Sequence, residues 1–127
     1  MAYYSDSDIL MVGSQGDILL SLNCGYGQPV KTTVYLKKLD GSSDKLTEFS
    51  DNTDNYNLGN SDSLKGQVIE IHSTIHDIRD TIPGQEVEDI ELKIKVWCNA
   101  DSVDTEFLKR TKGKGQLVVC KYEVNIF

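Results

Sequence analysis

Strict alternation of apolar and polar residues constrains the fold of this chain more than any other feature of its sequence. The clearest case is VEDIELKIKVWC, residues 87–98, where every second position from Ile90 to Cys98 is apolar. Successive side chains of a β-strand point to opposite faces, whereas an amphipathic helix repeats its apolar residues every three or four positions. This run therefore predicts a strand with one buried face and one solvent-facing side.

Similar alternation recurs along the chain and predicts an all-β fold. Strands are expected at residues 17–24, 30–38, 67–78, 87–98 and 116–127, with weaker strands at 8–12 and 45–49. Turn-forming residues separate the runs, such as the Pro83-Gly84 pair, which suits the centre of a type II turn. About seven strands joined by turns predict a single domain, residues 1–127, folded as an antiparallel β-sandwich with Greek-key-like or barrel-like connections.

One segment near the C-terminus departs from this alternation. In NADSVDTEFLKRTKGKG, residues 99–115, Val103, Phe107 and Leu108 fall at helical spacing. Acidic residues come first, basic residues follow, and a glycine comes after them, which is the charge order that a helix dipole favours. This segment predicts one short α-helix near 102–111 between the last two strands.

The chain is acidic, with a formal net charge of −7 and a sequence pI near 4.7. A nucleic-acid-binding face needs clustered Lys and Arg, and an anionic membrane attracts cations, so we expect neither as a partner. No apolar run approaches the ~20 residues of a transmembrane helix. The start, MAYYSDSDILMVGSQGD, also lacks the basic and apolar regions of a signal peptide. We therefore expect a cytoplasmic protein.

The two histidines, His72 and His76, are four residues apart in the run QVIEIHSTIHDI. On a helix this spacing could hold a metal ion. On a strand, which rises about 3.3 Å per residue, the side chains start roughly 13 Å apart. A metal ion with ligands at about 2 Å cannot bind both, so we expect two solvent-side histidines and no metal site. The alternative is that one of them joins groups from a neighbouring strand.

The three cysteines, Cys24, Cys98 and Cys120, have no CxxC spacing and are odd in number. This pattern argues against a disulfide framework and against a zinc site. Each cysteine ends or interrupts an apolar run, where cysteine behaves as a small hydrophobic residue. We expect buried, reduced thiols.

A long polar connection is expected at residues 49–66, because no clear alternation occurs there. Its segment DNTDNYN, residues 51–57, offers oxygen ligands of the kind that Ca²⁺ prefers, but it lacks the glycine and glutamate of an EF-hand loop. Asp and Asn are also ordinary turn residues. We therefore expect no cofactor or metal, with a Ca²⁺ site in this segment as the alternative.

Three aromatic residues are the candidates for partner binding: Tyr35, Trp97 and Tyr56. Tyr35 and Trp97 fall on the polar sides of their strands, and Tyr56 lies in the polar connection. Exposed Trp and Tyr often anchor interfaces, although the 102–111 helix or a loop could instead cover them.

With no catalytic motif in the sequence, we expect a non-catalytic module that binds another protein or self-associates. The alternatives are a Ca²⁺-dependent ligand-binding sandwich and a small acidic inhibitor, such as an immunity-type protein.

Overall fold

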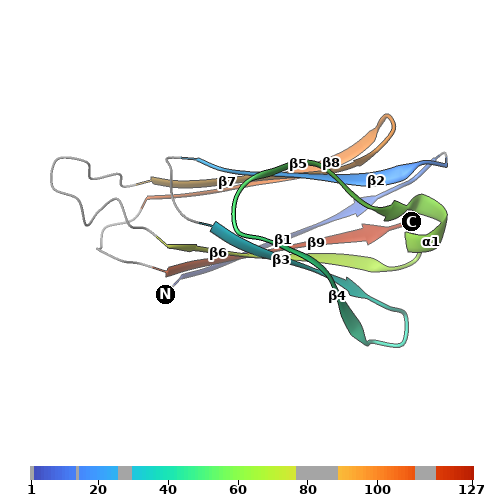
Figure 1. Ribbon diagram of the computed structural model, residues 1–127, viewed down its shortest axis with the longest axis horizontal. Helices are drawn as coiled ribbons and strands as arrows, with labels where there is room; N and C mark the ends of the chain where they lie inside the picture. The colour runs from blue at the N-terminus through green and yellow to red at the C-terminus, as the bar shows by residue number, and fades with distance from the viewer. Residues whose placement is uncertain (1, 14, 26–29, 77–88, 111–116) are drawn as a thin grey trace, which may run out of the picture.

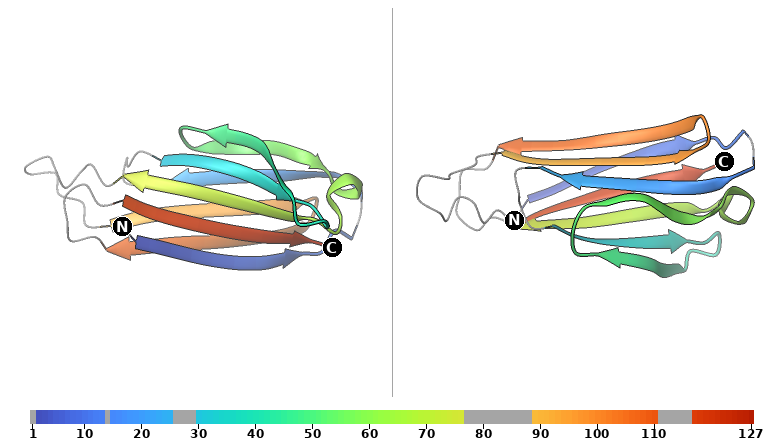
Figure 2. Two further views of the ribbon diagram at one scale, coloured as in Figure 1. Left: turned by 90° about the horizontal axis from the view of Figure 1, so that it is seen from below. Right: turned by 45° about the horizontal axis from the view of Figure 1, so that its top comes forward.

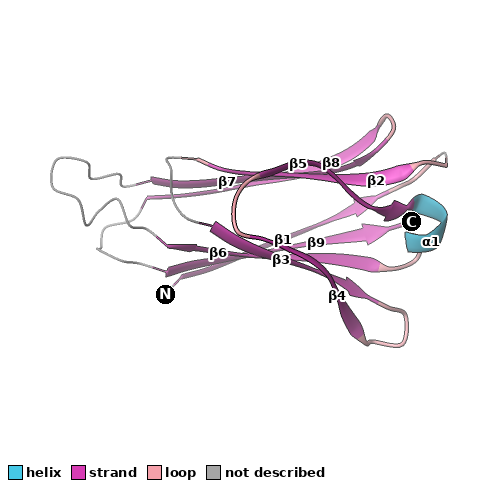
Figure 3. Ribbon diagram, viewed as in Figure 1, coloured by secondary structure: helices cyan, strands magenta, loops and turns pink. Residues whose placement is uncertain are grey.

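The structure is a computed structural model that describes residues 2–13, 15–25, 30–76, 89–110 and 117–127. Strands account for most of these residues, and the single helix among them, α1 (Ser61–Leu64), is four residues long (Figure 3). In these ranges no helix is long and apolar enough to cross a membrane. The expected all-β fold is confirmed.

Within the described residues, nine strands form two sheets that pack face to face (Figure 1). The five-stranded sheet contains, in spatial order, β1 (Ala2–Leu10), β9 (Leu117–Ile126), β6 (Val68–His76), β3 (Val30–Lys37) and β4 (Ser43–Phe49). The four-stranded sheet contains β5 (Thr53–Asn60), β2 (Asp17–Cys24), β7 (Asp89–Cys98) and β8 (Asp101–Arg110). The expected β-sandwich is therefore confirmed, with more strands than the seven expected.

The last strand, β9, lies inside the five-stranded sheet between β1 and β6. Its pairing with β6 is antiparallel, but its pairing with β1 is parallel, so the sandwich is not antiparallel throughout. The parallel ladder continues past β1, because the Phe127 amide donates to the Leu10 carbonyl and the Val12 amide donates to the Phe127 carbonyl, both at 2.9 Å. Figure 2 shows β1 at the edge of this sheet, beside β9.

The core lies between the sheets and is built from the alternating positions that the sequence indicated. Every second residue of β9 is buried, and Tyr122 is the largest fully buried side chain among the described residues. The expected strands at 17–24, 30–38 and 45–49 correspond to β2, β3 and β4, and those at 67–78, 87–98 and 116–127 to β6, β7 and β9. The weak strand at 8–12 is longer and begins earlier, as β1. The Pro83-Gly84 turn lies outside the described residues.

The expectation of an α-helix near 102–111 is wrong, because residues 101–110 form the strand β8. This strand pairs with β7 over ten residues without a register shift, from Cys98 opposite Asp101 to Asp89 opposite Arg110. Val103, Thr105 and Phe107 alternate on the half-buried inner side, whereas Leu108, read as part of a helical face, is 61% exposed. Pairing with the long neighbouring strand therefore overrides the local charge order that suggested a helix.

The connection expected at 49–66 is also mostly ordered secondary structure, namely β5 followed by α1. Leu58 is buried and Tyr56 packs against the core. Register shifts between β2 and β5 interrupt the alternation, which explains why the sequence pattern concealed this edge strand. The helix begins after Asn60, whose side-chain oxygen accepts a hydrogen bond from the Asp62 amide at 2.9 Å.

Candidate functional site

The three aromatic residues proposed for partner binding lie in three different places. Tyr35 is on the outer side of β3, because the alternate residues Val30, Thr32 and Val34 of this strand point into the core. Trp97 is on the outer side of β7, between the buried Val96 and Cys98. The two residues therefore lie on opposite faces of the sandwich and cannot belong to one small site.

Tyr56 is half-buried and packs against the core from β5. Its ring meets that of Phe49 edge to face, with centroids 4.9 Å apart. Because Phe49 ends β4 and Tyr56 belongs to the other sheet, this contact links the two sheets on one side of the sandwich. Aromatic pairs of this geometry contribute to packing, so Tyr56 has a structural task in addition to the binding role expected for it.

Tyr35 packs against one of the two histidines. The His72 ring lies edge to face with it at 5.2 Å, and its Nε2 lies 3.3 Å from a carboxylate oxygen of Glu70. His72 and His76 are both on β6, where His72 is half-buried and His76 is exposed. The expectation of two histidines on the solvent side of a strand is confirmed.

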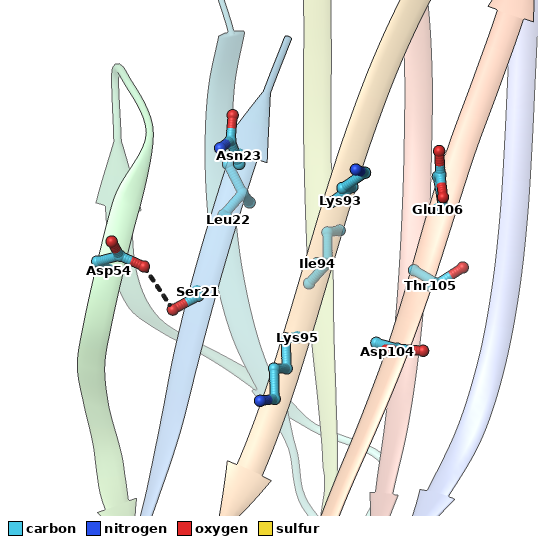
Figure 4. Close-up of a pocket in the computed structure, with 10 residues that line it drawn as sticks. All are labelled: Ser21, Leu22, Asn23, Asp54, Lys93, Ile94, Lys95, Asp104, Thr105 and Glu106. Carbon is cyan, nitrogen blue, oxygen red and sulfur yellow. Dashed lines mark hydrogen bonds between the residues drawn. The ribbon is translucent and has the colours of Figure 1, made fainter.

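A groove crosses the outer face of the four-stranded sheet, with a volume of about 420 Å³ (Figure 4). All four strands contribute to it, and its walls come from the two edge strands, β5 and β8. It is lined by Ser21, Leu22, Asn23, Asp54, Lys93, Ile94, Lys95, Asp104, Thr105 and Glu106.

Two lysines of the inner strand β7 form the floor of this groove, and their ammonium groups point to opposite ends of it (Figure 4). Lys93 forms an ion pair with Glu91 at 2.9 Å. The Lys95 ammonium lies over the Trp97 ring, 5.0 Å from its centroid, in a cation–π contact. Trp97 therefore flanks the groove, and the lysine stems between the two head groups line its middle.

Acidic residues form the walls of the groove. Asp104 and Glu106 are exposed on β8, opposite Lys95 and Lys93 in the strand register. On the other side, the Asp54 carboxylate accepts a hydrogen bond from the Ser21 hydroxyl at 2.9 Å. Among the described residues none of these three carboxylates forms an ion pair.

The polar residues considered as Ca²⁺ ligands are held by contacts with neighbouring backbone and side chains. The Asn52 side-chain oxygen accepts a 2.7 Å hydrogen bond from the Cys24 amide, and the Asn57 side chain donates to Asp17 at 2.9 Å. In the part of the chain that the structure describes, no three His, Cys, Asp or Glu side chains are grouped so that they could hold a metal ion.

The three cysteines are buried and free, as expected. Burial raises the pKa of Cys24 to about 11, with a smaller contribution from the nearby charge of Glu91. Burial likewise raises the pKa of Cys120 to about 12. A thiol that keeps its proton at neutral pH is a poor nucleophile, so neither of these two has the electrostatic setting of a catalytic thiolate.

The groove walls are the part of this site that sequence reasoning missed. The sequence predicts a helix for Asp104 and Glu106, and a polar connection with possible metal ligands for Asp54. The alternation of Val103, Thr105 and Phe107 was the signal that places the two β8 acids together on the outer face. Alternation in the strands expected at 17–24 and 87–98 does predict the outward side of Ser21, Asn23, Lys93, Lys95 and Trp97.

Comparison with known proteins finds no relative of this chain. The chain matches no family model, and it matches neither a curated protein nor a solved structure.

Proposed function

We propose that this chain is a non-catalytic module that binds another protein through the outer face of its four-stranded sheet. The observation that carries the proposal is the groove on that face, with Trp97 beside it. Grooves that combine an aliphatic floor, a few polar groups and a neighbouring aromatic ring are suited to recognition.

Trp97 is the expected anchor of this contact. It is half-buried, and in the strand register it lies opposite Leu19 of β2, which is also half-buried. Tryptophan buries a large area while few torsion angles become fixed, and it is over-represented among residues that dominate binding energy. Trp97 and Leu19 together offer the partner an apolar contact next to the polar groove.

A different protein fits this face better than a second copy of the chain. The face is acidic, and the chain as a whole carries a net charge of −7. Two such faces would repel one another, because like charges in an interface are unfavourable. An acidic inhibitor that covers a basic active site would be one form of this module.

The proposal can be tested with affinity-tagged full-length chain in an extract of its own cells. Trp97→Ala and the exposed-site variant Glu106→Lys should each lose a protein that the unaltered chain retains. Tyr35→Ala on the opposite face is the matched aromatic control and should retain it. Circular dichroism must show that all variants are folded. Retention by both variants of the four-stranded face, or equal loss in the control, would contradict the proposal.

A further inference from the structure

We infer that the groove on the four-stranded sheet accepts an extended, cationic segment of the partner protein, with Lys or Arg at every second position. This inference rests on the proposed function, and it specifies the chemistry of the partner. Its first support is the uneven distribution of charge between the two faces of the sandwich.

The acidic character of the described residues is concentrated on the face that carries the groove. Among the residues whose side chains the structure describes, the outer face of the four-stranded sheet has five acidic and two basic residues: Asp17, Asp54, Glu91, Asp104, Glu106, Lys93 and Lys95. The outer face of the five-stranded sheet has three acidic and four basic residues: Glu48, Glu70, Glu123, Lys31, Lys37, Lys45 and Lys121. Charge complementarity therefore directs a basic partner to the groove rather than to the opposite face.

Contacts within the groove strengthen this preference for a basic partner. Both lysine head groups are engaged at its ends, Lys93 with Glu91 and Lys95 with the Trp97 ring. The wall carboxylates of Asp104 and Glu106 are exposed, and they form no ion pair with any described residue. A cation that enters between the walls thus meets carboxylates without ion-pair partners, above the aliphatic stems of the lysines.

The spacing of the wall carboxylates matches an extended chain. Asp104 and Glu106 are two residues apart on a strand, which corresponds to about 6.6–6.8 Å along its axis. An extended peptide that runs along β8 repeats its side chains on one side with the same period. Lys or Arg at two such positions can therefore pair with both carboxylates at once, and Arg can do so through two parallel hydrogen bonds.

The chain contains a single tryptophan, so the fluorescence of Trp97 reports on this face alone. The probe is a synthetic peptide of alternating Lys and Ser, titrated into the full chain at low salt, with the Glu-Ser peptide for comparison. We expect a saturable change with the cationic peptide and none with the anionic one. Binding should weaken with added salt, because the charges lie at the surface.

The decisive comparison is between two charge-neutralising double variants. Asp104→Asn with Glu106→Gln should weaken binding by about fivefold, as expected for two exposed charge pairs. Glu70→Gln with Glu123→Gln, which removes the same charge from the other face, should change it less than about twofold. No response in the unaltered chain, or equal weakening in both variants, would overturn the inference. The proposed function would survive that result if the Trp97→Ala and Glu106→Lys variants still lost the cellular partner.

Discussion

The hydroxyl of Tyr122 donates a 2.6 Å hydrogen bond to the carboxylate of Asp8. Tyr122 lies on the inner strand β9 and Asp8 on the neighbouring edge strand β1, so the bond anchors that edge to the core. The next inward residue of β1, Asp6, accepts a 2.6 Å hydrogen bond from the Thr105 hydroxyl of β8 and so joins the edges of the two sheets. Inward-facing charges on an edge strand also discourage its pairing with other chains.

Replacing Tyr122 by Phe tests this anchor. The variant leaves the half-buried Asp8 carboxylate without its donor, and we expect a loss of about 1–2 kcal/mol in the free energy of unfolding. Tyr35→Phe, on the outer face, should stay within about 0.5 kcal/mol of the unaltered chain. Urea denaturation followed by circular dichroism measures both. Equal stability of the two variants would show that the hydrogen bond contributes nothing.

The raised pKa values of two buried thiols predict a loss of stability at alkaline pH. Their pKa values in the folded chain are about 11 for Cys24 and about 12 for Cys120, against 9.0 for an ordinary cysteine. Above pH 9 the unfolded chain therefore releases these protons first and binds fewer protons than the native state. The free energy of unfolding must then fall as pH rises from about 9 towards 11.

Urea denaturation under reducing conditions between pH 8 and 10.5 checks this prediction. Cys24→Ala and Cys120→Ala should each lower stability at pH 8, because they leave cavities, but each should show a smaller decline towards pH 10.5. Burial also raises the pKa of Tyr122, with its hydrogen bond to Asp8 as the second cause, so some decline persists in both variants. A decline as steep as in the unaltered chain would contradict the role of the thiols.

A buried polar pair crosses two strands of the five-stranded sheet. The hydroxyls of Thr32 and Ser73 are 2.7 Å apart, and both residues are fully buried. Thr32→Val should cost about 1–3 kcal/mol, because it leaves the Ser73 hydroxyl unsatisfied. The double variant Thr32→Val with Ser73→Ala should cost less than the sum of the single variants. A double-mutant cycle in urea measures the difference, and strict additivity would refute the coupling.

The fold class could be predicted from the sequence because the inward positions of β2, β3, β6, β7 and β9 are nearly all apolar. The edge strands were harder to predict, because one side of an edge strand is partly solvated and its apolar–polar alternation is weaker. In β1 the inward positions include Asp6 and Asp8. Their hydrogen-bond donors, Thr105 and Tyr122, lie 99 and 114 residues away along the chain. No local pattern reveals such partners.

The candidate site could be predicted only in its two inner strands, β2 and β7. Alternation in β7 places Lys93, Lys95 and Trp97 on one outer face, as expected. The groove itself depends on β5 and β8, which border the sheet through pairings with β2 and β7. Read without those pairings, Asp54 suggests a turn and Asp104 a helix start. Long-range register, which single-residue preferences do not encode, decides where these carboxylates lie.

The turn between β7 and β8 depends on a backbone conformation that few side chains tolerate. Asn99 has φ = 55°, in the left-handed region, and its side chain donates to the Gln15 carbonyl at 3.0 Å. Asn99→Gly and Asn99→Ala both lose that hydrogen bond, but only alanine carries a Cβ that opposes this φ. The alanine variant should therefore be less stable than the glycine variant by about 1 kcal/mol in thermal or urea denaturation. Equal stabilities would show that the turn relaxes without strain.

Removal of residues 123–127 should unfold the chain. This truncation deletes Val124 and Ile126, both fully buried, and with them the pairing of β9 to the start of β6 and the end of β1. Each buried side chain contributes about 1.5–3 kcal/mol, so the pair contributes about 3–6 kcal/mol in a domain whose total stability is typically about 5–15 kcal/mol. Phe127→Ser is the control, because that side chain is 58% exposed and its backbone hydrogen bonds remain. Circular dichroism should show loss of β-structure in the truncated chain only, and a cooperative melt at the temperature of the full chain would mean that the end of β9 does not hold the sheet together.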